Sequence, residues 1–258
     1  MYNDLRKTVN SLLSKNARLD GRKFDEYRPI SIETGVSRNA EGSARVKIGD
    51  TEVLAGVKME IGKPYPDTQD RGGMMFNVEL TPMSSPEFET GPPGSYAIEL
   101  ARVTDRAVRE SKCIDTKKLC IEVGESVWTI IVDIVPVNEA GNMFDAASLA
   151  AAAALSVAKL PTYADGVVDY KKITEKKLPF TKDVPISVTV FKYGNVLLVD
   201  PDSDEEKVFD ARLTVGVQAD GKLCSMQKGG DESISTEDID KMVTFAIAKA
   251  SELRKHFP

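Results

Sequence analysis

Three arginines, spaced four and three residues apart, are the residues of this chain best suited to hold phosphate groups. At about 100° per residue, Arg102, Arg106 and Arg109 fall close together on one face of a helix predicted over residues 96–111. We call them the arginine stripe. Guanidinium groups stay ionised and offer a planar fork of donors to phosphate oxygens. The opposite face would enter a core and carries Ala97, Leu100, Ala101, Thr104, Ala107 and Val108.

The same arginines also admit an ordinary structural role. Acidic residues lie three or four positions away from them, which is pairing distance on a helix surface. The candidate ion pairs are Glu99–Arg102, Asp105–Arg109 and Arg106–Glu110. Exposed pairs of this kind contribute little to stability and are typical of a solvated helix face. Charge spacing alone leaves both interpretations open.

The overall charge limits the kind of partner that the stripe could serve. The chain has 258 residues, of which 40 are acidic and 34 basic, for a net charge of -6 at pH 7. A field of that sign is unsuited to a protein that coats nucleic acid with its whole surface. Any polyanion site must therefore be local, or be completed by a partner.

The sequence offers little material for histidine or cysteine chemistry. His256 is the single histidine, and Cys113, Cys120 and Cys224 show no CxxC spacing. A histidine triad, a disulfide framework and a zinc site are thereby disfavoured, and a reducing compartment such as the cytoplasm is expected. Catalysis would have to use carboxylates, arginines or a metal ion. No apolar run approaches the roughly twenty residues of a membrane span, so we expect no membrane partner.

The elements that must position these residues follow from hydrophobic periodicity and turn signals. An amphipathic helix opens the chain, with Leu5, Val9 and Leu13 on one face, and strand-like segments follow it. Two long polar loops, 61–73 and 83–94, come before the arginine helix. Loops of this kind are common sites of binding.

Beyond the arginine helix, two buried strands are predicted over residues 118–123 and 126–137. An alanine-rich helix follows over 145–160, with Asp145 as its expected N-cap. A lysine-rich connection, 170–182, ends this part of the chain.

A second set of strands and a closing helix from about Ser235 to Arg254 make up the rest. Strands followed by helices, twice, predict an α+β protein with two lobes of mixed sheet and packed helices. We expect one domain, including the N-terminal docking helix, over residues 1–182 and a C-terminal lobe over residues 183–258.

A series of collinear motifs resembles the RNase PH family, and within it the non-catalytic subunits of the archaeal exosome ring. In chain order the motifs are RLDGR, TEVLAGV, GKPYPDT, SSPEFETGPP, IELARVTDR, SVWTIIVDIVPV, NMFDAASLAAAAAL and DPDSDEEKVFD. Each motif is short, but their order over nearly the whole chain is specific. The resemblance implies an RNase PH-like fold, of the ribosomal protein S5 domain 2-like type.

The resemblance also implies partners. Members of this kind form a ring of three heterodimers, each with a catalytic RNase PH-like sister subunit. RNA-binding cap subunits sit on one face of the ring. Single-stranded RNA threads through the centre and is degraded from its 3′ end with phosphate.

Within this resemblance, the positions that grip phosphate in active members carry other residues here. Active members have an arginine just ahead of the helix, and alignment on the IELAR motif puts Tyr96 at that position. They have a Thr-Arg-Thr loop before the alanine-rich helix, where this chain has Glu139, Ala140 and Gly141. A glutamate there would repel phosphate, and losing charged donors from such a clamp costs several kcal/mol of transition-state stabilisation.

Two carboxylates remain at a third element of the active site. Asp204 and Asp210 keep a six-residue separation like that of the aspartate pair in active members, where the pair would hold a metal or support leaving-group chemistry. An acidic turn, with Asp210 paired to Arg212, is the alternative interpretation. Carboxylates without a phosphate grip complete no mechanism, so we expect no bound metal, no cofactor and no catalytic residue.

The 61–73 loop is a second candidate RNA contact. Lys63 and Arg71 flank Tyr65, a mixture suited to a single-stranded backbone with a base stacked on the ring. Tyr65, between two prolines, could equally anchor a turn.

The sequence therefore predicts a non-catalytic ring subunit, not itself an enzyme, that helps to structure its sister's phosphorolytic 3′–5′ exoribonuclease site and binds RNA. The resemblance implies that the arginine helix lies near that site, with Arg106 as the central contact. The alternative is an autonomous phosphate-dependent 3′–5′ exoribonuclease. A third possibility, an RNA-binding module unconnected with degradation, is disfavoured by the acidic charge.

Overall fold

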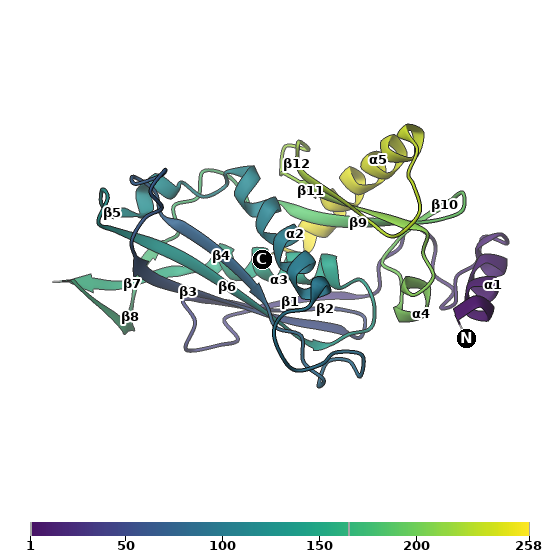
Figure 1. Cartoon of the computed structure of the whole chain (residues 1–258), viewed down its shortest axis with the longest axis horizontal. Coiled ribbons are helices and arrows are strands. Elements are labelled where there is room, and N and C mark those ends of the chain that lie inside the picture. The colour runs from purple at the N-terminus through teal and green to yellow at the C-terminus, as the bar shows by residue number, and fades with distance from the viewer. Residues whose placement is uncertain (1, 165, 258) are drawn as a thin grey trace.

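The computed structural model describes residues 2–164 and 166–257, and two main sheets enclose a central helix (Figure 1). The first sheet has the order β1-β2-β3-β6-β4, and β5 pairs with the first residues of β6. All its pairings are antiparallel except that of β4 with β6. Its strands are β1 (Ile30–Thr34), β2 (Gly42–Ile48), β3 (Thr51–Gly62), β4 (Gly73–Val78), β5 (Cys120–Glu122) and β6 (Ser126–Asn138).

The second sheet is antiparallel, with the order β10-β9-β11-β12. A separate hairpin of two strands projects from the far end of the molecule (Figure 1). The strands of the second sheet are β9 (Ile186–Tyr193), β10 (Val196–Val199), β11 (Ala211–Val217) and β12 (Leu223–Gly229). Those of the hairpin are β7 (Lys159–Ala164) and β8 (Val167–Lys177).

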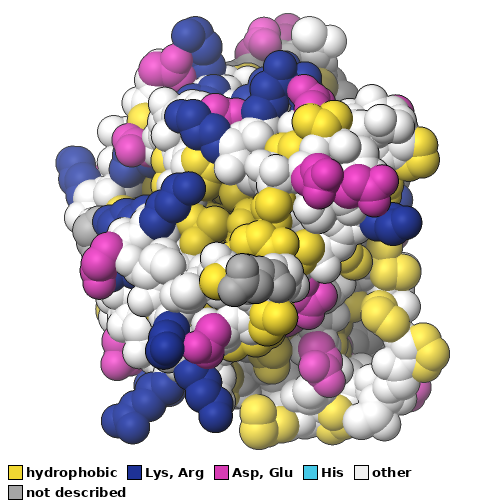
Figure 2. All heavy atoms as spheres, turned by 90° about the vertical axis from the view of Figure 1, so that its left-hand side faces the viewer, with side chains coloured by type: hydrophobic (Ala, Val, Ile, Leu, Met, Phe, Trp, Pro, Cys, Tyr) yellow, Lys and Arg dark blue, Asp and Glu magenta, His cyan; other side chains and the backbone are white. Residues whose placement is uncertain are grey.

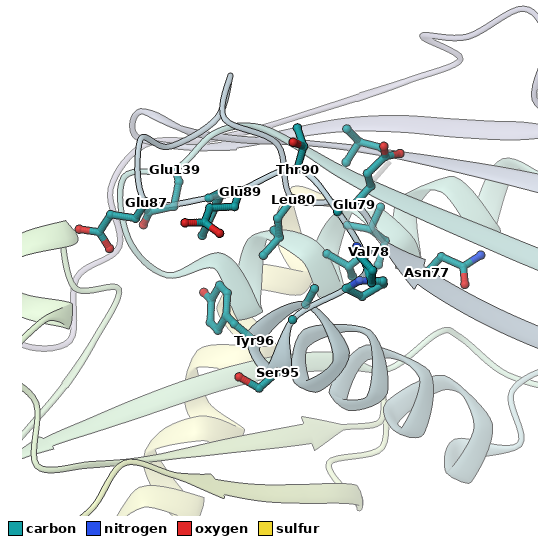
Figure 3. Close-up of a pocket in the computed structure, with 18 of the residues that line it drawn as sticks. Asn77, Val78, Glu79, Leu80, Glu87, Glu89, Thr90, Ser95, Tyr96 and Glu139 are labelled. Atoms are coloured by element: carbon teal, nitrogen blue, oxygen red, sulfur yellow. The ribbon is translucent and has the colours of Figure 1, made fainter.

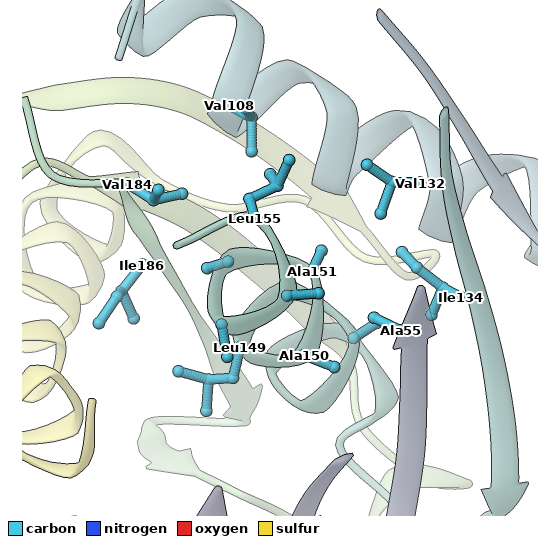
Figure 4. Close-up of a cluster of buried hydrophobic side chains, with 14 of the residues drawn as sticks. Ala55, Val108, Val132, Ile134, Leu149, Ala150, Ala151, Leu155, Val184 and Ile186 are labelled. Carbon is cyan, nitrogen blue, oxygen red and sulfur yellow. The ribbon is translucent and has the colours of Figure 1, made fainter. Parts of the chain in front are cut away.

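Helix α3 (Met143–Val157) lies between the two sheets and forms the centre of the core. It packs on β2 and β3 of the first sheet and on β9 of the second. Figure 4 shows its small side chains among Ala55 and Ile134 from one sheet and Ile186 from the other. Every residue from Met143 to Leu155 is buried. Alanine has no side chain beyond Cβ, so this helix can approach both sheets closely, and the main core forms between them.

The remaining helices cover the outer surfaces. Helix α2 lies over β4 and β12, and α5 packs on β9 and β11. Helix α1 docks through Val9 and Leu13 on a small apolar cluster with Phe191, Tyr193 and Leu198. The bounds are α1 (Tyr2–Leu13), α2 (Ser95–Ser111), α4 (Ser203–Glu206) and α5 (Thr236–Leu253), with short 3-10 turns at Thr116–Leu119 and Arg254–His256. No helix of the described residues is long and apolar enough to cross a membrane.

The predicted α+β class is confirmed, but three local expectations are wrong. Asp145 is not the N-cap of α3, because the helix begins two residues earlier with Asn142 as its cap and Asp145 buried in its first turn. Most of the predicted lysine-rich connection is strand β8, because it pairs with β7 in an antiparallel hairpin. The predicted strand at 118–123 forms only β5, which is short and partly exposed at the sheet edge.

The β7–β8 hairpin presents apolar side chains to solvent. Figure 2, which looks at this end of the molecule, shows a hydrophobic patch with Lys and Arg side chains around it. The exposed apolar residues of the hairpin are Tyr163, Val167, Tyr170 and Ile173. An apolar surface with a charged surround is typical of a contact with another protein.

Candidate functional site

The arginine stripe lies on the solvent face of α2, as its spacing predicts. All six residues expected on the core face are buried, together with Val103. Arg102 and Arg106 are exposed, and no ion pair or hydrogen bond joins their side chains to any other described residue. Two guanidinium groups on one exposed face are therefore available to an external anion.

The three ion pairs of the ordinary structural interpretation form only in part. Arg109 does bind Asp105, at 2.6 Å, and its guanidinium also donates to the carbonyl oxygen of Met74. Glu99 instead turns inward to Arg212 of β11, 2.9 Å away. Among the described residues, the pairs Glu99–Arg102 and Arg106–Glu110 are absent. The stripe is thus less neutralised than the sequence suggests.

The 61–73 loop approaches the stripe. The pKa of the Arg109 guanidinium is raised, first by its hydrogen bonds to Asp105, and the nearby Tyr65 hydroxyl adds to this effect. Tyr65 is 64% exposed. Lys63 is also exposed, and Arg71 makes a long ion pair with Asp70, at 3.6 Å. The loop leads into β4, where the Met74 carbonyl oxygen accepts from Arg109 at one end of the stripe.

A pocket of about 1330 Å³ opens at the N-terminus of α2 (Figure 3). Its walls come from the end of β4, the 87–94 loop, β6, α4 and β11. Tyr96 stands at its base between two other rings. The Tyr96 ring stacks on Phe88, with 6.2 Å between centroids, and meets the edge of Phe144 at 5.8 Å. The residue predicted to replace a phosphate-binding arginine is thus held in an aromatic contact.

Acidic side chains outnumber basic ones in the lining of this pocket. Figure 3 shows several of them around Tyr96. The carboxylates are Glu79, Glu87, Glu89, Asp133, Glu139 and Glu206, against the two cations Lys207 and Arg212. Lys207 lies 3.4 Å from Glu87, and Arg212 is already paired with Glu99 and stacked 3.9 Å above the Phe144 ring. A pocket with this balance of charge repels phosphate.

The segment 139–142, which precedes α3, is held from both sides. The carbonyl oxygens of Ala140 and Gly141 accept hydrogen bonds from Arg28, at 2.6 and 3.0 Å. The Gly141 amide donates to the Glu139 carboxylate at 2.8 Å, and the Asn142 amide donates to Glu206 at 2.6 Å. The backbone N–H groups of Gly141 and Asn142, just ahead of α3, are thus bonded to carboxylates of the same chain.

Burial changes the protonation of Glu206. Desolvation raises its pKa to about 7, while the hydrogen bond from Asn142 opposes that rise and the charge of Glu139 adds to it. Burial likewise raises the pKa of the Tyr96 hydroxyl well above its ordinary value. The pocket therefore carries a carboxyl group that changes charge near neutral pH.

Asp204 and Asp210 lie outside the pocket. Asp204 is exposed on α4, and Asp210 accepts hydrogen bonds from Arg6 of α1 and from the amide of Gly194. Arg212 does not pair with Asp210, since it binds Glu99. Within the described residues, no group of three or more histidine, cysteine or acidic side chains is placed to hold a metal ion.

A second pair with the same six-residue separation does line the pocket. Glu206 and Arg212 each stand two positions further along the chain than Asp204 and Asp210. Arg212 turns toward Glu99 of α2, whereas Glu206 accepts a hydrogen bond from the Asn142 amide just ahead of α3.

A buried network of charges stands behind the 139–142 segment. Arg18 pairs with Glu205 at 2.5 Å, with both side chains fully buried. Arg22 and Arg28 both bind the Asp200 carboxylate, which is also fully buried. The RLDGR motif therefore supplies Arg18 and Arg22 to a structural network and not to the surface.

Comparison with known proteins assigns the chain to a family. Its residues 26–161 match the profile of the 3′ exoribonuclease family, domain 1, and residues 183–249 match that of domain 2. The exosome complex component Rrp42 of Methanocella arvoryzae is 48% identical over 250 residues, covering 97% of this chain and 94% of the relative.

Solved structures agree with this assignment. One described as the Archaeoglobus fulgidus exosome with RNA bound to the active site has a TM-score of 0.91 and 45% identity, and covers 100% of this chain and 99% of that chain. Another, described as an archaeal exosome core, has a TM-score of 0.87 and 42% identity, and covers 99% of this chain and 97% of that chain. The chain therefore belongs to the 3′ exoribonuclease family, the RNase PH family that its motifs resemble.

Proposed function

We propose that this chain is a non-catalytic subunit of an RNA-degrading exosome ring. It pairs with a catalytic RNase PH-like sister in a ring of three heterodimers and helps to structure the sister's phosphorolytic 3′–5′ exoribonuclease site. RNA-binding caps complete the assembly, which works on single-stranded RNA in the cytoplasm. Similarity to an exosome component over 97% of the chain supports this proposal.

The main support for the proposal is the difference in charge between the pocket and the exposed face of α2. The chain's own pocket is lined by six carboxylates, and both of its cations already have acidic partners. The exposed face of α2, by contrast, carries Arg102 and Arg106 with no partner among the described residues. Anion binding is therefore favoured on the outer face and disfavoured in the pocket, which fits RNA contact without turnover and argues against an autonomous exoribonuclease.

The RNA contacts of this function follow from the same surface. Arg102, Arg106 and Arg109 would hold successive phosphates, while Tyr65 offers a ring for stacking beside them. Lys63 and Arg71 extend the positive charge along the 61–73 loop. The apolar β7–β8 hairpin offers a surface suited to a neighbouring subunit.

Replacing Arg106 with alanine in the assembled ring should weaken RNA binding for all sequences, because phosphate contacts carry no base information. It should also flatten the dependence of the logarithm of the binding constant on the logarithm of salt concentration by roughly 0.7, since one phosphate contact fewer releases fewer counterions. Fluorescence anisotropy with a single-stranded RNA at several salt concentrations measures both quantities.

Arg38→Ala is the matched control, because Arg38 is an exposed arginine outside α2. It should leave affinity and salt slope unchanged. Both variants should keep the unfolding temperature and the ring assembly of the wild type. If a stable, assembled Arg106→Ala ring binds RNA with the wild-type affinity and salt slope, the stripe is only a solvated helix face.

A further inference from the structure

The pocket at the start of α2 combines apolar walls with a surplus of carboxylates. Its volume is about 1330 Å³, and Leu80, Phe88, Tyr96 and Phe209 are among the apolar side chains that line it. Six carboxylates line the same space against two cations, both of which have acidic partners. A large hollow of this kind suits cationic groups on long apolar stems, because the stems pack on the walls while the charges meet the carboxylates.

Two of the six carboxylates have no partner within the chain. Glu79 directly follows β4 and Glu89 lies in the loop before α2, and both are exposed. Neither side chain makes a hydrogen bond or an ion pair with any other described residue. Figure 3 shows both in the same pocket as Tyr96. The other four carboxylates are already bound, namely Glu87 to Lys207, Asp133 to Asn77, Glu139 to the Gly141 amide and Glu206 to the Asn142 amide.

One wall of the pocket already holds a guanidinium group between an aromatic ring and a carboxylate. Arg212 lies 3.9 Å above the centre of the Phe144 ring and pairs with Glu99 at 2.9 Å. A guanidinium group is planar and weakly hydrated, so it stacks on rings and forms forked pairs with carboxylates better than an ammonium group does. The rings of Phe88 and Tyr96, together with the two unpaired carboxylates, offer the same contacts to an external guanidinium.

We propose that this pocket receives an arginine-bearing segment of a partner polypeptide. Guanidinium groups of the segment would pair with Glu79 and Glu89, and its apolar atoms would pack against Leu80 and Phe88. The volume fits several residues of a peptide rather than a single ion. This inference goes beyond the proposed function, because it gives the chain's own pocket a ligand and requires neither catalysis nor RNA.

The two unpaired carboxylates can be neutralised at nearly constant shape. Glu79→Gln with Glu89→Gln removes both charges and keeps the length of both side chains. Glu122→Gln with Glu125→Gln is the matched control, because these two glutamates are exposed and lie outside the pocket. All four positions are on the surface, so both double variants should keep the unfolding temperature of the wild type.

The probe is a capped peptide of sequence Arg-Leu-Gly-Leu-Arg, and NMR titration of the full-length chain measures its binding. The amide shifts should map to the residues that line the pocket. The Glu79 and Glu89 variant should bind at least about tenfold more weakly than the wild type, since it loses charge-assisted pairs, while the control variant should match the wild type. A peptide with citrulline, the neutral analogue of arginine, at both ends should also bind at least about tenfold more weakly.

Four results would overturn the proposal. The first is no binding of the probe to the wild type at about 1 mM peptide. The second and third are wild-type affinity in the Glu79 and Glu89 variant and equal affinity of the citrulline peptide, since each would show that the charge is not recognised. The fourth is spermine binding to the same residues as tightly as the peptide, because a free polyamine would then be the better ligand. The RNA contact of α2 is tested separately, since this titration contains no RNA.

Discussion

Replacing Asp200 with alanine should lower the free energy of unfolding by about 3–5 kcal/mol. The Asp200 carboxylate is fully buried and accepts five hydrogen bonds. Arg22 gives one, Arg28 gives three and the Asn142 side chain gives one. Removing it would leave the Arg28 side chain, 11% exposed, without its carboxylate partner, and the Arg22 side chain, 12% exposed, with Asp20 alone. An unpaired buried charge costs more than the lost bonds alone.

Chemical denaturation of the purified chain measures this loss, which corresponds to a fall of roughly 10 °C in unfolding temperature for a chain of this size. Asp200 has φ 49°, a left-handed conformation that asparagine tolerates better than alanine. Asp200→Asn therefore separates the charge from the backbone cost. Exposed Asp204 is the control, and its replacement by alanine should change stability by less than about 0.5 kcal/mol. A loss below about 1 kcal/mol for Asp200→Ala would mean that the network does not hold the fold.

Stability should also fall as pH rises from 5 to 7, because of Asp145. Its side chain is buried and accepts from the Tyr27 hydroxyl at 2.7 Å, from the Thr189 amide at 2.8 Å and from Asn142. Burial raises the Asp145 pKa from 3.8 to about 7, against the hydrogen bonds that favour the charged form. The folded chain thus keeps a proton that the unfolded chain has lost. The resulting stabilisation is complete below the unfolded pKa and is lost as pH rises through the folded pKa.

The expected loss is about 1.4 kcal/mol per pH unit, or roughly 2–3 kcal/mol between pH 5 and pH 7. Denaturation of the wild type and of Asp145→Asn across this range isolates it. Asparagine cannot titrate, and other groups, including Glu206, cancel in the difference between the two curves. The variant should be less stable at pH 5, with the gap narrowing toward pH 7. Parallel curves would mean that Asp145 stays ionised inside the protein.

The periodic features of the chain were predictable, because they depend on neighbours in the sequence. The two faces of α2 follow from the 3.6-residue repeat, and the core face is buried as expected. Pairing of Asp105 with Arg109 is likewise a local matter of four residues. Motif order also predicted the family correctly.

The errors come from contacts between distant parts of the chain. Glu99 is well placed for Arg102 on the helix, but Arg212 from the second sheet is a buried partner and takes it instead. Asp145 fits the pattern of an N-cap, yet Tyr27 and Thr189 draw it into the core. These partners, Arg212, Tyr27 and Thr189, lie far along the chain from the residues that they bind, so a local window of sequence does not contain them.

The central claim is that this chain contributes structure and RNA contacts but no turnover, and a side-by-side phosphorolysis assay tests it most directly. The chain alone, its catalytic sister alone and the two together are given a single-stranded RNA with inorganic phosphate, and nucleoside diphosphate release is measured. The account predicts no release by this chain at any concentration, and faster release by the assembled pair than by the sister alone. Phosphate-dependent shortening of the RNA by this chain alone, abolished by Glu206→Ala, would contradict it.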